Sequence, residues 1–320
     1  MKVSRRTWGT GLCALLACRA VWAQPWPTAA IRLIVPYTLA GTTDAQARVL
    51  ASGLSKEAGW KVVVENRPGS AGSVGLEALA TSRPDGHTLA IGQTANLVIH
   101  QAMELPRPFD AAKAFTPITL LSRQPVVLVV RTGTQASLAG LLAAARSRDL
   151  PLVMVSAANG SVGHLAGELM MKRAGLRLTH IPYTGAAPAL SALVNGHADF
   201  AFPTVQAALP LIQAGRLRVL AVSSEGRLPH LPQVPTLTEA GFPGLVVHDW
   251  KLLIGPAGLP ASVQQILLQR VLQVLKRPAW AHVSPSDATG ATPQPDLHRF
   301  LDAERQQWRR LVREVFPGSR

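Results

Sequence analysis

The sequence predicts an α/β protein of two lobes, each with a mostly parallel sheet flanked by helices. Short apolar runs alternate along the chain with stretches of helical periodicity, which is typical of parallel α/β sheets. Turn-rich segments near residues 123–125 and 223–226 indicate that the chain crosses between the lobes twice. The 320 residues, 48% hydrophobic and 16% charged, are enough to form the cores of such domains and are not typical of a disordered chain.

Eight short runs of aliphatic and β-branched residues predict strands. They are Ile31–Val35, Lys61–Glu65, Thr88–Gly92, Val126–Arg131, Leu152–Ser156, Leu178–Ile181, Ala198–Phe202 and Leu217–Val222. Segments with helical spacing lie between them, and each ends at a glycine that permits the left-handed conformation of a helix C-terminus. The clearest of these helices are Thr43–Ala58, Ser161–Ala174 and Ala186–Asn195. A further strand is expected at Val246–Ile254.

The predicted crossings divide the chain into three segments. Residues 24–123 form the first part of lobe 1, residues 124–224 form lobe 2, and residues 225–320 return to lobe 1. The returning segment has two long amphipathic helices, near Ala261–Lys276 and Pro295–Val315, but too few strands for a sheet of its own. Two lobes joined by two crossings leave a cleft between them, and open α/β sheets bind ligands beyond the carboxyl ends of their strands.

Residues 1–23 predict a secretory signal peptide that is cleaved before Gln24. Three basic residues precede the apolar stretch Trp8–Ala17, and Val21-Trp22-Ala23 offers small residues for cleavage. The paired Arg5 and Arg6 leave two routes of export open, the general route and the twin-arginine route. The mature protein is therefore expected outside the cytoplasm.

Both cysteines, Cys13 and Cys18, lie within this predicted signal peptide, so the mature chain would contain no thiol, disulfide or cysteine metal site. A lipoprotein signal with Cys18 as the lipidated residue is the alternative, but the leucine before Ala17 fits such a signal poorly. No later run approaches the roughly 18 apolar residues of a membrane span. We expect a protein without a membrane anchor.

The formal net charge is +14, from 32 Lys and Arg against 18 Asp and Glu. Removing the four basic residues of the signal peptide leaves 28 against 18, or +10. An exported protein is not expected to bind nucleic acid, and no stretch interleaves basic and aromatic residues as a base-stacking surface would. The basic cluster Arg305–Arg313 lies on one predicted helix and indicates a solvated face. The charge permits anionic ligands without locating them.

Four strand-to-helix turns offer hydroxyls, amides or glycines. Thr43-Asp44-Ala45-Gln46 fits a capping box, in which the threonine hydroxyl and the glutamine side chain satisfy backbone amides of the helix. Gly41, which has no side chain, leaves the amides of this turn accessible. The other turns are Gln93-Thr94-Ala95-Asn96, Asn159-Gly160-Ser161 and Tyr183-Thr184-Gly185. Because the N-terminus of a helix attracts anions, turns from both lobes could converge on one anionic ligand. Capped turns also arise in every repeated α/β unit, so this pattern alone leaves both interpretations open.

Several motifs of the chain resemble the Bug family of solute receptors, the periplasmic binding components of tripartite tricarboxylate transporters. The resemblance covers about Pro27 to Trp308, and the Glu65-Asn66-Arg67-Pro68-Gly69 block is highly characteristic of the family. The other matching motifs are Val35-Pro36-Tyr37 with Gly41 and Asp44, Pro84-Asp85-Gly86, His164-Leu165-Ala166-Gly167-Glu168, Pro182-Tyr183-Thr184-Gly185 and Pro235-Thr236-Leu237 with Glu239-Ala240-Gly241.

This resemblance implies a type II, Venus-flytrap binding protein that closes on a small carboxylate, has no cofactor and catalyses no reaction. In the family, backbone groups, hydroxyls and bridging waters from both lobes hold one ligand carboxylate. The positions that match the family's site are Tyr37, Gly41, Thr42, Asp44, Thr94, Asn96, Ser156, Ser161, His164, Tyr183, Thr184, Gly185 and Asp199. Thr43 and Gly160 join them from the helix-turn interpretation. The implied partners of this expected monomer are integral-membrane transporter subunits or, alternatively, a membrane sensor kinase that detects the closed form.

The chain departs from the family at Leu39-Ala40-Gly41, where Pro-Gly-Gly is usual, and at His87, where tyrosine is usual. The methyl group of Ala40 narrows the approach of a ligand to the backbone. Two of the matching residues also have structural interpretations. Asp44 suits the first turn of a helix, and His164 is spaced to pair with Glu168 on one helix face. Trp250 is expected in the core.

An enzyme is the rival class of protein. Ser161 lies in Asn159-Gly160-Ser161-Val162-Gly163, which lacks the first glycine of a nucleophile elbow. The sequence has no dinucleotide fingerprint, P-loop or HExxH motif, and its nine histidines have no metal-ligand spacing. No catalytic or metal-binding residue is therefore expected.

Overall fold

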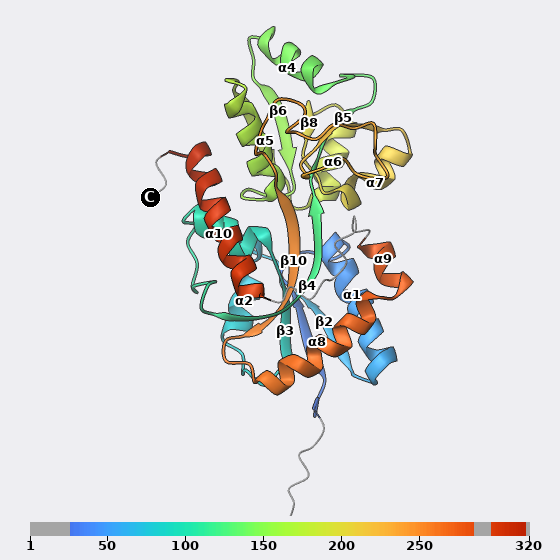
Figure 1. Cartoon of the computed structure of the whole chain (residues 1–320), viewed down its shortest axis with the longest axis vertical. Coiled ribbons are helices and arrows are strands. Elements are labelled where there is room, and N and C mark those ends of the chain that lie inside the picture. The colour runs from blue at the N-terminus through green and yellow to red at the C-terminus, as the bar shows by residue number, and fades with distance from the viewer. Residues whose placement is uncertain (1–25, 285–295, 318–320) are drawn as a thin grey trace, which may run out of the picture.

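The computed structural model describes residues 26–284 and 296–317, and the predicted signal peptide lies outside them. These residues form two five-stranded sheets, one in each lobe (Figure 1). The first sheet has the order β2-β1-β3-β10-β4, with β1 (Ile31–Val35), β2 (Val62–Asn66), β3 (Thr88–Gln93), β4 (Phe115–Pro125) and β10 (His248–Pro256). The second has the order β7-β6-β8-β5-β9, with β5 (Val127–Arg131), β6 (Leu152–Ser156), β7 (Leu178–Pro182), β8 (Phe200–Ala201) and β9 (Leu217–Val222).

The predicted α/β class with two lobes is confirmed, but the sheets are mixed instead of mostly parallel. In the first sheet β1 runs parallel to β2 and β3, whereas β10 runs antiparallel to β3 and β4. The second sheet repeats this plan, with β6 parallel to β7 and β8, and with β5 antiparallel to β8 and β9. The antiparallel strands are those on which the chain enters or leaves a lobe.

Helices cover both faces of each sheet. In lobe 1, α1 (Thr42–Ala58), α8 (Ala261–Leu275) and α9 (Pro278–Val283) pack on one face, and α2 (Ser73–Ala80), the π-helical turn η2 (Ala95–Ile99), α3 (His100–Ala102) and α10 (Leu297–Val315) lie on the other. In lobe 2, α4 (Leu138–Arg146) and α5 (Val162–Arg173) share one core cluster, and α6 (Ala186–Val194) and α7 (Val205–Gln213) share another. None of the helices in the described ranges is both long and apolar enough to cross a membrane.

The two chain crossings lie side by side and are joined by one buried serine. The Ser223 hydroxyl accepts a hydrogen bond from Val126 N at 2.9 Å and donates to Val247 O at 2.6 Å. Its backbone N–H donates to Val126 O and its carbonyl accepts from Val247 N. Val126 follows β4 and Val247 precedes β10, so Ser223 ties the outgoing crossing to the returning one.

The return to lobe 1 begins later than residue 225. Val222 pairs with Thr236 in an isolated bridge, and Leu228 and Val234 are buried in the core of lobe 2. Residues 228–237 therefore pack against lobe 2, and β10 is the first returning element that joins the sheet of lobe 1.

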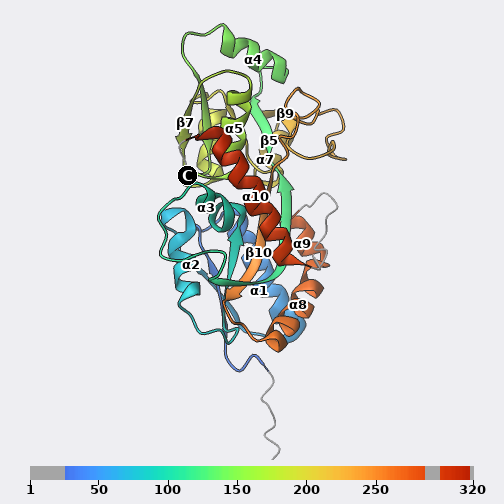
Figure 2. The ribbon, with the colours of Figure 1, turned by 60° about the vertical axis from the view of Figure 1, so that its left-hand side comes forward.

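Helix α10 contacts both lobes. Its buried Trp308 and Leu311 belong to one apolar cluster that includes Leu252 of lobe 1 and Leu169 of lobe 2. Figure 2 shows this helix running along the molecule past both sheets. Two hydrogen bonds from Arg173 on α5, at 2.6 and 2.9 Å, hold the carboxylate of Glu314 near its end. The last helix therefore packs on lobe 2 as well as on lobe 1, where it was expected.

Replacing Ser223 with alanine should destabilise the protein. The substitution leaves the buried Val126 N–H and Val247 C=O without the hydroxyl they share, at a cost of about 2 kcal/mol in the free energy of unfolding. Urea unfolding would measure it. Ser147→Ala, which removes an exposed hydroxyl at the end of α4, is the control and should cost less than about 0.5 kcal/mol. Equal effects of the two substitutions would contradict the role given to Ser223.

Candidate functional site

The carboxyl ends of the parallel strands in the two lobes face each other. We call this region the interlobe face and define it by turns 36–42 and 93–96 in lobe 1 and turns 156–161 and 182–185 in lobe 2. The lobes contact each other beside these turns. Gly160 of lobe 2 lies against the ring of His100 in lobe 1, and the Gln206 side chain of lobe 2 contacts Gln124 and the carbonyl of Val283. Most of the predicted ligand residues lie within this face.

The predicted capping box at the start of α1 is wrong. The helix begins at Thr42, its cap is Gly41, and no side chain caps it. The Thr43 hydroxyl instead accepts a hydrogen bond from Gln93, and the Gln46 side chain donates to Val283 O at 3.1 Å. The positive end of α1 is therefore not satisfied by a capping side chain and is directed at the interlobe face, as an anion site requires.

Asp44 holds the first turn together. Its buried carboxylate accepts hydrogen bonds from Ala40 N at 3.1 Å, from Asn66 Nδ2 at 3.0 Å and from two nitrogens of Arg48 at 3.0 Å. Burial raises the pKa of Asp44, but the hydrogen bonds from Arg48, Asn66 and Ala40 outweigh burial and hold the pKa below its usual value. All these contacts are within lobe 1, so Asp44 positions the turn. Asn66 of the characteristic block joins it by bonding both Asp44 and Tyr37 O.

The departure at Leu39-Ala40 gives the turn a strained residue. Ala40 has φ 63, in the left-handed region where a side chain costs energy and glycine does not. The backbone N–H of this residue donates to Asp44, which fixes the conformation. Leu39 beside it is 66% exposed, so the tip of the turn carries an apolar side chain in solvent.

Tyr37 and Asn96 join turns 36–42 and 93–96. Asn96 donates to the Tyr37 hydroxyl at 3.1 Å and accepts from Gln93 N at 2.9 Å. Burial, and next the charge of Asp249, raise the pKa of Tyr37, so the phenol stays protonated. Thr94 has a structural role, because its hydroxyl accepts from Trp250 N at 2.8 Å.

In lobe 2, turn 156–161 is held by side chains that were predicted to bind ligand. Ser161 caps α5 by accepting from His164 N, and His164 Nδ1 accepts from Gly160 N at 3.1 Å. The His164 ring stacks on His180 at 3.9 Å and lies 3.6 Å from Glu168, its expected partner. Ser156 donates to Ala158 O and contacts Nε2 of His180 at 2.7 Å. Burial, with His164 nearby, lowers the pKa of His180 to about 4, which keeps this histidine neutral.

Turn 182–185 extends the ladder between β6 and β7. Tyr183 N donates to Ser156 O and Gly185 N to Ala157 O, both at 2.9 Å. Gly185 has φ 128 and is the cap of α6, which no side chain caps. Thr184 is exposed between them. A second helix start without a side-chain cap therefore lies at the interlobe face.

Asp199 does not lie with the other predicted residues. It precedes β8, at the end of the strand that points away from lobe 1. Its carboxylate accepts from Val153 N and from Arg148, both at 2.7 Å. Asp199 thus fixes the start of β6 against β8 and is not a candidate ligand residue.

Two charged residues of the interlobe region were not predicted, Asp249 and Lys251 on β10. They flank Trp250, whose side chain is on the opposite face of the sheet and fully buried. Lys251 is only 2% exposed, and its ammonium donates to the Thr42 hydroxyl at 3.4 Å, at the start of α1. Burial raises the pKa of Asp249 and lowers that of Lys251, and each charge partly offsets the shift of the other. The sequence contains a signal that could have identified them, because two opposite charges lie two residues apart in an otherwise apolar strand.

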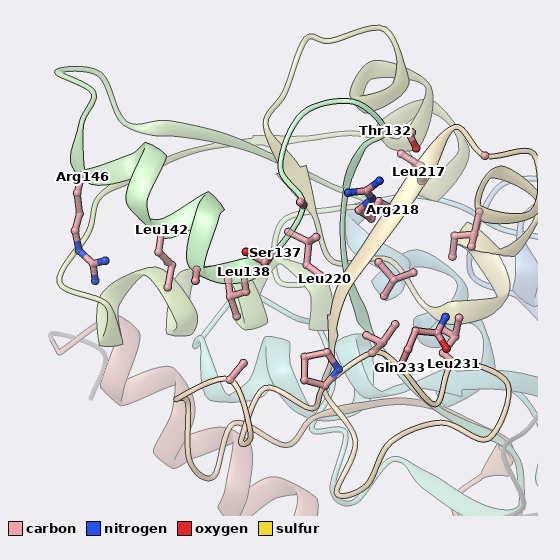
Figure 3. A pocket seen from close by; sticks show the side chains of 18 residues that line it. Thr132, Ser137, Leu138, Leu142, Arg146, Leu217, Arg218, Leu220, Leu231 and Gln233 are labelled. Atoms are coloured by element: carbon pink, nitrogen blue, oxygen red, sulfur yellow. The ribbon is translucent and has the colours of Figure 1, made fainter.

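A separate groove of about 810 Å³ lies within lobe 2, away from the interlobe face. Figure 3 shows it between α4, β9 and the 231–240 segment, with Leu138, Leu142, Leu220 and Leu231 among its lining. None of the predicted ligand residues lines this groove. Its place in the fold does not support a role in ligand binding between the lobes.

Comparisons with known proteins agree with the fold and identify the family. Residues 46–316 match the model of the tripartite tricarboxylate transporter family receptor. BugT from Bordetella pertussis is 34% identical over 301 residues, which are 92% of this chain and 92% of BugT. An R. palustris protein solved with adipate is 32% identical, has a TM-score of 0.84, and covers 91% of this chain and 98% of its own. MatC from Rhodopseudomonas palustris with bound malate is 27% identical, with a TM-score of 0.82 over 90% and 100% of the two chains. The resemblance to Bug receptors is confirmed.

Replacing Ala40 with glycine should stabilise the protein by about 0.5 to 1 kcal/mol, because glycine removes the left-handed strain at a small entropic cost. The control is Ala143→Gly on the exposed side of α4, where the same substitution should destabilise by about 1 kcal/mol. Urea unfolding of both variants would show opposite signs. A loss of stability at both positions would contradict the strain assigned to Ala40.

Replacing Asp44 with asparagine should cost about 2 kcal/mol at neutral pH, because an amide cannot accept all the hydrogen bonds of the carboxylate. Since the folded-state pKa of Asp44 is lowered, its stabilisation is present above the unfolded-state pKa and is lost as the pH falls. The difference between wild type and variant should therefore stay constant from about pH 7 to about pH 5 and shrink as the pH falls from about 5 to about 2. Urea unfolding at several pH values measures it, with the exposed Asp302→Asn as control. A difference that does not depend on pH would contradict the assignment.

Proposed function

The chain belongs to the tripartite tricarboxylate transporter family of receptors, and on this premise we propose that it binds a small carboxylate between its lobes and delivers it to integral-membrane transporter subunits. The observation that carries the proposal is the start of α1, which has no side-chain cap and lies at the interlobe face beside a buried lysine. Helix amides and an ammonium group together suit a carboxylate. The related structures with adipate and with malate support the same class of ligand.

Closure of the lobes follows from contacts that only the closed form provides. A carboxylate held by turn 36–42 of lobe 1 gains further contacts when turns 156–161 and 182–185 of lobe 2 approach it. A ligand shifts an equilibrium between open and closed forms only by its difference in affinity for the two. Ser223 lies at the point where both crossings meet, so we assign it to the hinge. The closed surface is what the transporter subunits would recognise.

The remaining assignments are parts of the same proposal. Export through the signal peptide of residues 1–23 places the receptor in the periplasm, where family receptors act. Gly41, Thr42 and Thr184 are the predicted residues that remain closest to a ligand role, because they lie on the facing turns and carry few structural hydrogen bonds. The backbone N–H groups of Gly160 and Gly185 already donate within lobe 2. The protein acts as a monomer, with no cofactor and no catalytic step.

Binding should be visible as stabilisation by carboxylates. A ligand at about 100 times its dissociation constant stabilises the folded state by about 2.7 kcal/mol. We expect thermal-shift and calorimetric titrations of residues 24–320, refolded to remove co-purified ligand, to detect at least one compound in a panel of mono-, di- and tricarboxylates that includes adipate and malate. Absence of any stabilisation across this panel would contradict the proposed function.

The exposed Thr184 offers a test of where the ligand binds. Thr184→Leu places a bulky apolar group on the interlobe face and should weaken carboxylate binding by about tenfold or more, because it removes a hydroxyl and narrows the site. Thr134→Leu makes the same change in an exposed turn at the far end of β5 and should leave affinity unchanged. Calorimetry with the tightest ligand of the panel compares them. Equal affinities for both variants would place the site elsewhere.

A further inference from the structure

A buried ammonium group and a nearby carboxylate face the interlobe region from the middle of the first sheet. Lys251 is almost completely buried, and its Nζ reaches Thr42 Oγ1 at the start of α1. Asp249 lies two residues earlier on the same face of β10 and acts electrostatically on both Lys251 and Tyr37. Within the described part of the chain, no ion pair joins Asp249 and Lys251 directly. The two opposite charges are therefore close but separated.

The neighbours of this pair have unused hydrogen-bonding atoms. In the register of β10 with β4, Lys251 lies opposite Ser122 and Asp249 lies opposite Gln124. Ser122 Oγ and Gln124 Oε1 are buried, and neither has a hydrogen-bond partner among the described residues. Buried polar atoms nearly always have a partner in protein or solvent. Unpaired atoms on the face that carries Lys251 and Asp249 indicate that a polar group from outside the fold completes this cluster.

The charges around this cluster indicate the chemistry of that group. Lys251 and the positive end of α1 both favour an anion near Thr42. Asp249, two residues earlier on the same face of β10 and therefore about 7 Å away along the strand, favours a hydrogen-bond donor. A carboxylate with a hydroxyl or ammonium group on the adjacent carbon carries both features at such a spacing.

We propose that Lys251 and Asp249 make this receptor selective for 2-hydroxy or 2-amino carboxylates. Lys251 binds an oxygen of the ligand carboxylate at the start of α1, and Asp249 accepts a hydrogen bond from the hydroxyl or ammonium on the neighbouring carbon. The ligand thereby bridges the two charges that the fold leaves apart. This inference rests on the proposed function and specifies the class of carboxylate.

Three four-carbon dicarboxylates test the inference, because they differ only at the second carbon. Malate carries a hydroxyl there, aspartate an ammonium group, and succinate neither. Calorimetry of the mature protein should show that malate or aspartate binds at least about tenfold more tightly than succinate. Equal affinities for all three would overturn the role of Asp249. Binding of adipate with no binding of any of the three would overturn this inference while leaving the proposed function intact.

Substitutions separate the roles of the two residues. Lys251→Met should weaken binding of malate, aspartate and succinate alike by about tenfold or more, whereas Lys61→Met, at an exposed lysine before β2, should change none of them. Asp249→Leu should remove the preference over succinate. Asp249→Asn should retain binding of malate but lose that of aspartate, which distinguishes a hydroxyl from an ammonium group on the ligand.

Folding of the variants is checked by urea unfolding, and Lys251→Gln replaces Lys251→Met where the latter does not fold. Wild-type affinity in a folded Lys251 variant would overturn the inference. Failure of the wild type to bind any carboxylate in the wider panel would instead overturn the proposed function, so the two failures are distinguishable.

Discussion

The alternation of side chains along β10 is the constraint on which the rest of the structure depends. This strand lies between β3 and β4 in the first sheet, so both of its edges are hydrogen-bonded, and helices pack on both of its faces. On one face Trp250, Leu252 and Ile254 belong to the apolar cluster that includes α10. On the other face Asp249 and Lys251 point toward the start of α1, and Leu253 continues into the apolar core beneath them. Polar groups are tolerated there because the strand end meets the interlobe face, where ligand and solvent can satisfy them.

The same strand connects the site to the hinge. Val247, immediately before β10, is bonded to Ser223, and Trp250 N is bonded to Thr94 in a turn of the interlobe face. Helix α10 adds a second link between the lobes, through apolar contacts and the Arg173–Glu314 pair. That ion pair is partly exposed and contributes little by itself, so the apolar packing is the larger part of this link. The lobes are therefore connected at two places, at the crossings near Ser223 and along α10.

How much of this could be predicted from the sequence depends on the kind of signal. Apolar runs such as Ile31–Val35 and Leu152–Ser156 located strands to the residue, because continuous burial leaves an unambiguous pattern. The eleven-residue β4 was missed, since Pro117, Pro125 and several polar residues obscure it. The capping box failed because Thr43 and Gln46 have better partners in distant segments, Gln93 and Val283. Such long-range competition for a polar side chain cannot be seen in local sequence.

Three features around the first turn of α1 break local rules of protein structure. Ala40 adopts a conformation that suits glycine, Lys251 is buried with no direct ion-pair partner among the described residues, and the start of α1 lacks a capping side chain. Each feature costs stability, and all three meet around the first turn of α1. Proteins retain such costs where a binding partner offsets them. An anion at the start of α1 would offset two of the three, because it neutralises Lys251 and satisfies the helix amides, whereas the strain at Ala40 belongs to the turn whose conformation the hydrogen bond to Asp44 fixes.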